Sequence, residues 1–224
     1  MARVYYSLYD RLLRAETLKD AFRKVKKANG APGIDGQTIA DYASGLESET
    51  CRLLRELKDK TYRPQAVRRK EIDKPNGGVR LLGIPTVRDR VVQQALNDIL
   101  APIFDPHFHP SSYGYRKNRS AHDAIAKATA FMRRYGLCHV VDMDLSKCFD
   151  TLDHDLIIKA VRKRVADGTV LTLISQFLES GVMTGHGVEK TEIGSPQGGV
   201  ITPPAGELQS QDQRNHPAQW AGQP

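Results

Sequence analysis

Apolar residues recur at helical spacing along most of the chain, and several of these stretches begin at residues that favour helix N-termini. Ser or Thr followed three residues later by Asp, a capping-box pattern, starts at Thr17, Thr38, Thr86 and Ser120. Asn29 and Gly136 are typical C-terminal stops. The predicted helices run over residues 17–29, 38–57, 86–100, 120–136, 153–168 and 170–178.

Short strands are predicted between these helices. Residues 66–72 and 79–84 are strand-like, and Asn76-Gly77 between them is the strongest short signal for a hairpin. Residues 139–145 are predicted to form a buried strand, and residues 182–191 a second hairpin around Gly185–Gly187. The predicted fold class is α+β, rich in helix, with short antiparallel strands.

The composition is that of a soluble globular chain, with 40% apolar and 26% charged residues. No apolar run approaches the roughly 18 residues that span a bilayer, and the N-terminus has no apolar signal stretch. Cys51, Cys138 and Cys148 are far apart in sequence, which predicts three buried thiols in a reducing, cytoplasmic compartment without membrane association. Residues 201–224 are rich in Gln and Pro and are predicted to be disordered.

The net charge of +7 is concentrated in one segment. Seven basic residues lie between Lys60 and Arg80, against two acidic ones. Such a cluster is typical of a surface that binds phosphates, although a solvated charged face would have the same composition. The predicted RNA-binding residues are Lys60, Arg63, Arg68, Arg69 and Lys70.

Candidate chemistry lies at three further places. Asp142 and Asp144 fall on one face of the predicted strand, where carboxylates could bind Mg²⁺. These acids could instead cap the next turn, and a glycosyltransferase-type Asp-x-Asp is a rival interpretation. Lys74 and Arg80 lie on the tight hairpin, able to close over a triphosphate, and Ser195-Pro-Gln-Gly-Gly199 is a turn that allows close backbone approach. Either segment alone would more often be an ordinary turn.

Taken in order, the motifs of this chain resemble those of the group II intron reverse transcriptase/maturase family, over nearly all of residues 1–203. The matching motifs are Asn29–Asp35, Tyr62–Pro64, Lys74–Pro85, Arg88–Gln94, Tyr113–Arg116, Arg119–Asp123, the Asp144 segment and Ser195–Val200. The resemblance implies a partial right-hand polymerase fold. It divides the chain into a helical N-terminal extension (1–60), the fingers and the first part of the palm (61–203), and an aberrant disordered tail (204–224).

The resemblance also implies roles for individual residues. Asp144 would be a catalytic metal ligand, and Leu145 would offer its backbone carbonyl to the same Mg²⁺. Phe149 would lie beneath the incoming sugar and exclude a 2′-hydroxyl. Lys74 and Arg80 would hold the nucleotide phosphates, with Gln197 near the nascent base pair. The implied partners are an intron RNA template, a DNA primer and deoxynucleoside triphosphates, and the implied reaction is two-metal nucleotidyl transfer.

The sequence departs from the family in one respect. The family has a Tyr-x-Asp-Asp segment beyond the Gln-Gly-Gly turn, and this sequence contains no Asp-Asp pair. We therefore expect an interrupted reverse transcriptase, with a frameshift near residue 203. Three hypotheses follow: a polymerase that is active only when completed, an RNA-binding remnant without catalysis, and a non-functional relic.

Overall fold

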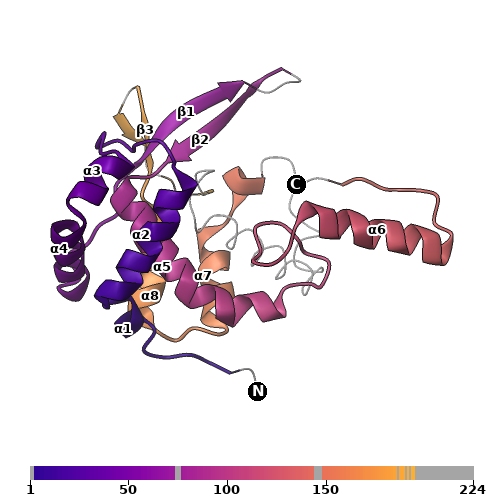
Figure 1. The fold of residues 1–224 in the computed structure, drawn as a ribbon, viewed down its shortest axis with the longest axis horizontal. Helices are drawn as coiled ribbons and strands as arrows, with labels where there is room; N and C mark the ends of the chain where they lie inside the picture. Colours follow the sequence, from indigo (N-terminus) through magenta and orange to yellow (C-terminus); the bar gives the residue numbers. More distant parts are fainter. Residues whose placement is uncertain are drawn as a thin grey trace.

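A computed structural model describes residues 3–73, 77–143, 148–185, 187–189, 191 and 193–194, with the side chains of Cys148 and Phe149 excepted. Figure 1 shows a helical body from which a β-hairpin projects. The elements are α1 Tyr9–Leu12, α2 Ala15–Ala28, α3 Ile39–Ser44, α4 Leu46–Lys58, β1 Val67–Asp73, β2 Val79–Ile84, α5 Val87–Phe104, the 3₁₀ turn η1 Asp105–His107, α6 Ala121–Tyr135, η2 Cys148–Thr151, α7 His154–Arg162, α8 Gly168–Leu178, β3 Val182–Thr184 and β4 Gly187–Glu189.

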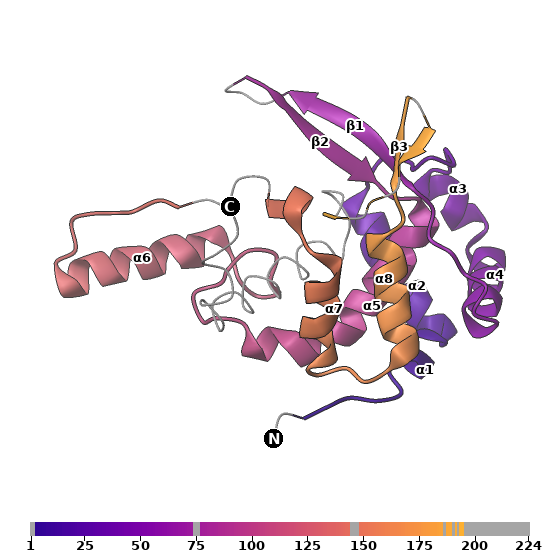
Figure 2. The ribbon, with the colours of Figure 1, turned by 180° about the vertical axis from the view of Figure 1, so that it is seen from behind.

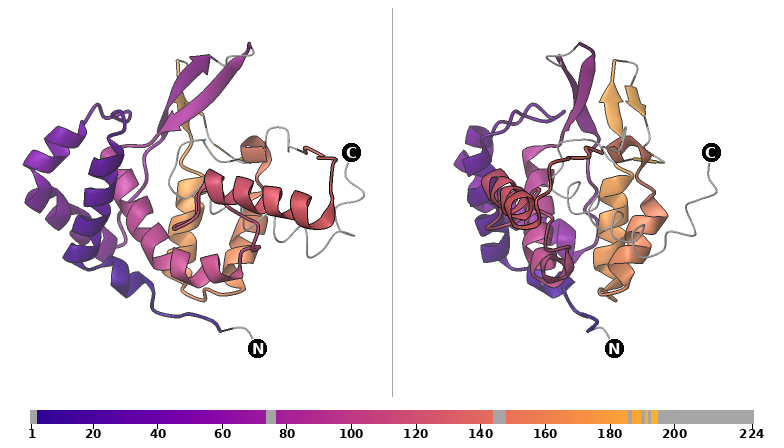
Figure 3. Two further views of the ribbon diagram at one scale, coloured as in Figure 1. Left: turned by 45° about the vertical axis from the view of Figure 1, so that its right-hand side comes forward. Right: turned by 90° about the vertical axis from the view of Figure 1, so that its right-hand side faces the viewer.

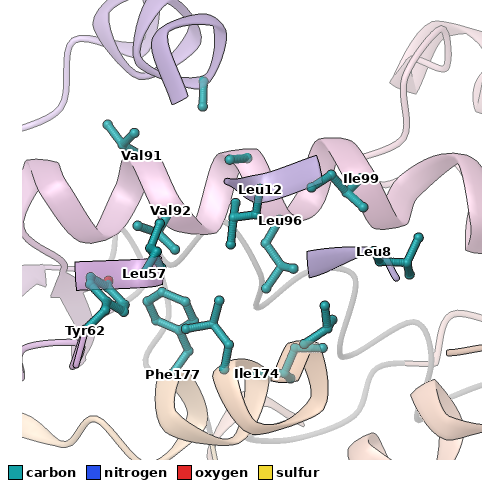
Figure 4. Close-up of a cluster of buried hydrophobic side chains, with 14 of the residues drawn as sticks. Leu8, Leu12, Leu57, Tyr62, Val91, Val92, Leu96, Ile99, Ile174 and Phe177 are labelled. Carbon is teal, nitrogen blue, oxygen red and sulfur yellow. The ribbon is translucent and has the colours of Figure 1, made fainter. Parts of the chain in front are cut away.

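Helix α5 is the centre of the hydrophobic core. The Thr86 side chain accepts a hydrogen bond from the Asp89 N–H and caps the helix, as the pattern at Thr86 predicted. Val87, Val92 and Leu96 are completely buried, because α2 packs against α5 on one side and α7 and α8 lie on the other (Figure 2). Figure 4 shows Leu96 and Val92 of α5 facing Ile174 and Phe177 of α8.

The N-terminal segments predicted to be helical are helical in the structure, but two helix boundaries differ from the prediction. Helix α2 ends at Asn29 in the left-handed conformation, as predicted, but it begins at Ala15 without a side-chain cap, so the predicted start at Thr17 was wrong. The capping box at Thr38 is confirmed. The helix that it opens is interrupted at Gly45, which separates α3 from α4, so the predicted continuous helix was also wrong.

The sheet has the strand order β2-β1-β3-β4. Both predicted hairpins are confirmed, since β1 pairs with β2 and β3 pairs with β4 in antiparallel orientation. The two hairpins join through a short parallel pairing, in which Val67 of β1 faces Val182 of β3. They lie side by side in the right-hand view of Figure 3.

Helix α6 and the segment after it differ most from the prediction. The capping box at Ser120 and the stop at Gly136 are confirmed, yet the side chains of α6 are not buried. Residues 139–143 form no strand, and Val140 and Val141 are 77% and 79% exposed. A buried strand needs a neighbouring strand and a covering layer, and the described strands provide neither for this segment. The prediction of a buried strand was therefore wrong for the described part of 139–145.

Two smaller predictions also need correction. Cys51 on α4 and Cys138 after α6 are exposed free thiols, because no described element covers them. Helix α7 ends at Arg162 rather than at Gly168, with Asp153 as its confirmed N-cap. Among the described residues, no helix is both long and apolar enough to cross a membrane.

Candidate nucleotide and nucleic-acid interface

The charged side chains of the β1–β2 hairpin are unequally distributed between its two faces. Directly opposed residues in an antiparallel pair share a face, so the register that pairs Ile72 with Arg80 places Arg80 on the face of Arg68 and Lys70. The other side chains that this register assigns to that face are Ile72, Leu82 and Ile84. One face therefore carries three cations and no acid among its described residues, and we call Arg68, Lys70 and Arg80 the basic face.

The opposite face carries more acidic than basic side chains. It carries Arg69, Glu71 and Asp73 of β1, and the Arg69 guanidinium lies 3.9 Å from the Glu189 carboxylate of β4. The two-residue period of a strand thus gives adjacent Arg68 and Arg69 different surroundings. Nε of Arg68 is buried without a hydrogen-bond partner among the described residues, whereas Arg69 has an acidic neighbour.

A buried polar cluster fixes the base of the hairpin to α5. The Asp89 carboxylate accepts a hydrogen bond of 2.5 Å from the Tyr62 hydroxyl and one of 3.0 Å from the Gln65 N–H. Burial raises the pKa of Asp89, while the hydrogen bonds from Tyr62, Thr86 and Gln65 oppose that rise. Burial, followed by the proximity of Asp89, raises the pKa of Tyr62 well above its usual value, so this phenol remains a donor.

A second polar contact holds the loop at residues 29–36. The segment of this loop from Gly30 to Asp35 resembles the N-terminal extension by which proteins of the family grip template RNA. Nη2 of Arg90 donates to the Ala31 carbonyl at 2.8 Å. Gly33 packs against the start of α5, where an added Cβ would lie 2.6 Å from Cα of Thr86. The loop is therefore fixed against the same helix that anchors the hairpin, on its N-terminal side.

The remaining predicted RNA-binding residues lie at the connection between α4 and β1. Arg63 folds back on this connection, with Nη1 donating to the carbonyls of Lys60 and Tyr62 at 3.0 and 2.8 Å. Lys60 has a left-handed backbone, with φ of 57°. Lys60 and Arg63 therefore lie in the connection that precedes β1 and do not belong to the basic face.

Lys74, Asp144, Leu145 and Gln197 lie outside the described residues, as does the side chain of Phe149. The structure does place the described flanks of the two segments that carry Asp144 and Gln197. Gly194 donates its N–H to the Leu152 carbonyl at 2.8 Å, so the residue before Ser195 lies beside the residues that follow Phe149. In the part of the chain that the structure describes, no group of three or more acidic, His or Cys side chains could hold a metal ion.

The Tyr113–Arg116 motif has a structural role in the described residues. The Arg116 side chain is 5% exposed, and its Nε donates to Asp105 at 2.7 Å while its other nitrogens bond the carbonyls of Asp105, His109 and Ser112. Tyr115 is 88% exposed and is therefore not part of the core.

A cavity of about 710 Å³ lies beside this loop. Its apolar wall includes Phe104, Ile157 and Ile174, and its rim includes the ion pair of Lys24 with Asp98. Arg80, the predicted nucleotide-binding residue whose side chain the structure describes, does not line it.

The sequence analysis identified the basic segment between Lys60 and Arg80 but did not assign its residues to the two faces of the hairpin. The alternation of side chains along a strand could have shown this, because it places Arg68, Lys70 and Arg80 on one face once the hairpin register is known. Nε2 of His154 lies 2.6 Å from the Gly194 carbonyl. No sequence signal predicts this contact between residues 40 positions apart.

Comparisons with known proteins agree with the family resemblance that the sequence motifs indicated. Residues 72–208 match the family model "Reverse transcriptase (RNA-dependent DNA polymerase)". Protein YkfC of Escherichia coli (strain K12) is 39% identical over 202 residues, which cover 86% of this chain and 53% of that protein. The group II intron-encoded protein LtrA of Lactococcus lactis subsp. cremoris is 36% identical over 205 residues, which cover 89% of this chain and 33% of LtrA. The chain therefore spans between a third and about half the length of these relatives.

A solved structure titled "Partial Cas6-RT-Cas1--Cas2 complex" superimposes with a TM-score of 0.59 over 93% of this chain and 34% of that one, at 19% identity. This likeness supports a partial reverse transcriptase fold of mixed helix and sheet. Enzymes of this family act on nucleic-acid templates with divalent metal ions. The family match and the intron-encoded relatives together show that the chain belongs to the reverse transcriptase family, in its group II intron reverse transcriptase/maturase branch.

Proposed function

We propose that the chain provides the template-binding and nucleotide-binding part of an RNA-directed DNA polymerase encoded by a group II intron. The observation that carries this proposal is the basic face of the β1–β2 hairpin, which holds Arg68, Lys70 and Arg80 and no acid among its described residues. Phosphates of an RNA template and of a deoxynucleoside triphosphate are the ligands that such a face would bind.

The anchoring of the hairpin supports the same proposal. Asp89 fixes the start of β1, and Arg90 fixes the loop at residues 29–36, so two surfaces assigned to nucleic acid are held by one rigid helix. Electrostatic binding is strongest when the charged groups are held in place before the ligand arrives.

The proposed reaction is nucleotidyl transfer from a deoxynucleoside triphosphate to a DNA primer on the intron RNA. Asp144 and the Leu145 carbonyl would hold Mg²⁺, which would activate the primer hydroxyl and stabilise the leaving pyrophosphate. Lys74 and Arg80 would hold the phosphates, Phe149 would exclude the 2′-hydroxyl, and Gln197 would lie near the nascent pair. The division into an extension (1–60), a polymerase part (61–203) and a tail (204–224) belongs to this proposal.

The test compares the two faces of the hairpin. Affinity for a structured RNA is measured by fluorescence anisotropy between 50 and 200 mM salt for Arg80→Ala and for Arg69→Ala as the matched control. Each phosphate contact that is lost lowers the slope of log affinity against log salt by roughly 0.7 to 0.9. We expect Arg80→Ala to lose affinity and slope and Arg69→Ala to stay close to the wild type. Equal losses in both variants, or affinity independent of salt, would refute the proposal.

A second candidate function is RNA binding without catalysis. It needs only the basic face of Arg68, Lys70 and Arg80, which could bind RNA phosphates without a metal site. Primer extension by the chain joined to the remaining polymerase part of a relative separates the candidates. Extension that Asp144→Ala abolishes would support the polymerase, and no extension would support RNA binding without catalysis.

A further inference from the structure

Cationic side chains gather where the N-terminal segment meets the end of α7. The N–H of Tyr5 donates to the Arg164 carbonyl at 2.8 Å, and the Tyr5 carbonyl accepts a hydrogen bond of 3.0 Å from the Ala166 N–H. The Arg3 guanidinium lies over the Tyr5 ring, with its Cζ 5.0 Å from the ring centroid. Arg3 and Arg164, which are far apart in the sequence, therefore lie at the same edge of the molecule.

The last turn of α7 adds two more cations to this edge. Lys159 and Arg162 are three positions apart and exposed, whereas Val161 between them is buried. The helix dipole favours cations at this end of α7, which accounts for Lys159 and Arg162 but not for Arg3, which comes from another segment. We call Arg3, Lys159, Arg162 and Arg164 the second basic patch.

Nearby acidic side chains do not pair with the second basic patch. Within the described part of the chain, none of its four cations forms an ion pair. Asp155 lies one helical turn before Lys159 without pairing with it. Asp167 follows the patch, and its carboxylate already accepts hydrogen bonds from the N–H groups of Tyr9 and Val170. Like charges that folding brings together repel one another, and a bound anion would relieve this repulsion.

The second basic patch lies far from the hairpin. Helix α8 begins at Gly168, just after the patch, and its 11 residues extend over about 16 Å towards β3 and the sheet. Figures 1 and 2 show the sheet at the top of the molecule, and the N-terminal segment with the α7–α8 connection at the bottom. An anion on the patch would therefore be separate from phosphates bound to the basic face of Arg68, Lys70 and Arg80.

The side chains at this edge suit a nucleic-acid backbone. The cations come from two separate segments, and Lys and Arg side chains contact phosphates without reading sequence. Tyr6, beside the patch, is 70% exposed, and an exposed aromatic ring next to cations can stack on an unpaired base.

We propose that the second basic patch binds the phosphate backbone of a folded RNA at a place separate from the hairpin. One RNA molecule would then contact the chain at both ends. The inference goes beyond the proposed function, which places RNA on the hairpin, and rests on it only for RNA as the ligand.

The experiment measures the affinity of the full chain for a fluorescein-labelled group II intron RNA by anisotropy over a range of salt concentrations. The patch variant is Lys159→Gln/Arg162→Gln, because Gln is neutral and favours a helix about as well as Lys and Arg do. The matched control is Arg23→Gln/Arg52→Gln, which removes the same net charge from cations that already pair with acids. A charge-conserving variant, Lys159→Arg/Arg162→Lys, keeps the patch cationic.

We expect the patch variant to bind the RNA roughly tenfold more weakly at about 0.1 M salt, because two phosphate contacts are lost. The slope of log affinity against log salt should fall by about 1.5 for the same reason. The control and the charge-conserving variant should bind as the wild type does. Adding Arg80→Ala to the patch variant should multiply the two losses, because the two surfaces are far apart.

The outcomes separate the inference from the proposed function. A patch variant that binds as the wild type does, together with a loss in Arg80→Ala, would overturn the inference alone. The reverse result would contradict the proposed function and support the inference, and a wild type that binds no RNA would overturn both.

Three further results would also overturn the inference. An equal loss in the control would show that only net charge matters, and an equal loss in the charge-conserving variant would show a structural role. Binding to phosphatidylserine vesicles that the patch variant loses, with unchanged RNA affinity, would assign the patch to a membrane surface.

Discussion

Replacing Tyr62 with Phe removes one hydroxyl from the buried cluster that anchors the hairpin. The hydroxyl donates to Asp89 at 2.5 Å, and both residues are buried, at 2% exposed each. After the substitution, Asp89 keeps the hydrogen bond from the Gln65 N–H, but one of its carboxylate oxygens loses this donor. The ring still packs against Phe177, with centroids 6.1 Å apart in the wild type, so the change is confined to the hydrogen bond.

The magnitude follows from the charge of the acceptor. A hydrogen bond to a charged group contributes about 1.5–3 kcal/mol to the free energy of unfolding, more than a neutral pair does. In a chain of this size, each kcal/mol shifts the melting temperature by about 2–4 °C. We therefore expect Tyr62→Phe to melt about 3–12 °C below the wild type at neutral pH.

The pH dependence has a defined sign. Burial raises the pKa of Asp89 above its ordinary value of 3.8, so its contribution to stability is complete below the unfolded pKa and decreases as pH rises through the folded one. Removing the Tyr62 donor destabilises the charged carboxylate and raises that pKa further. The difference in unfolding free energy between variant and wild type should thus be largest at neutral pH. It should shrink on acidification, beginning above pH 3.8.

The assay is urea unfolding followed by circular dichroism at several pH values, with Tyr42→Phe as the matched control. Tyr42 is a buried tyrosine whose hydroxyl makes no hydrogen bond within the described residues, and burial raises its pKa to about 12. Tyr42→Phe should lose less stability than Tyr62→Phe, without a dependence on acidic pH. Equal losses in the two variants, or a Tyr62→Phe deficit that grows as pH falls, would refute the assignment of the Asp89 hydrogen bond.

Four further predictions follow from the site and the fold. Gly33→Ala should lower the melting temperature, because its Cβ would meet the Thr86 backbone; differential scanning calorimetry would detect this. Cys51 and Cys138 should both react with a thiol reagent in the native chain, since both are exposed. The 224-residue chain should incorporate no labelled deoxynucleotide on a primed RNA template with Mg²⁺, because its sequence lacks an Asp-Asp pair. Joined to the remaining polymerase part of a relative, it should regain extension, Asp144→Ala should abolish this, and Phe149→Val should raise the ratio of ribonucleotide to deoxyribonucleotide incorporation.

Local signals in the sequence predicted most of the helices and both hairpins. Caps at Thr38, Thr86 and Ser120 satisfy backbone groups within one turn, and Asn76-Gly77 favours a hairpin turn, so these features require no distant partner. The order of the motifs, from Asn29 to Val200, also identified the family that the comparisons show.

Whatever depends on distant segments was decided only by the tertiary structure. The hydrophobicity of residues 139–143 predicted burial, but burial requires a covering layer, and the described elements leave Val140 and Val141 exposed. Adjacent Arg68 and Arg69 look alike in sequence but lie on opposite faces of the sheet. Only the tertiary structure shows that β4 brings Glu189 next to Arg69. The contact of His154 with Gly194 joins residues 40 positions apart, and no local pattern encodes such a pairing. Local hydrogen bonding therefore set the elements of this chain, whereas long-range packing set which of their side chains are buried, paired or exposed.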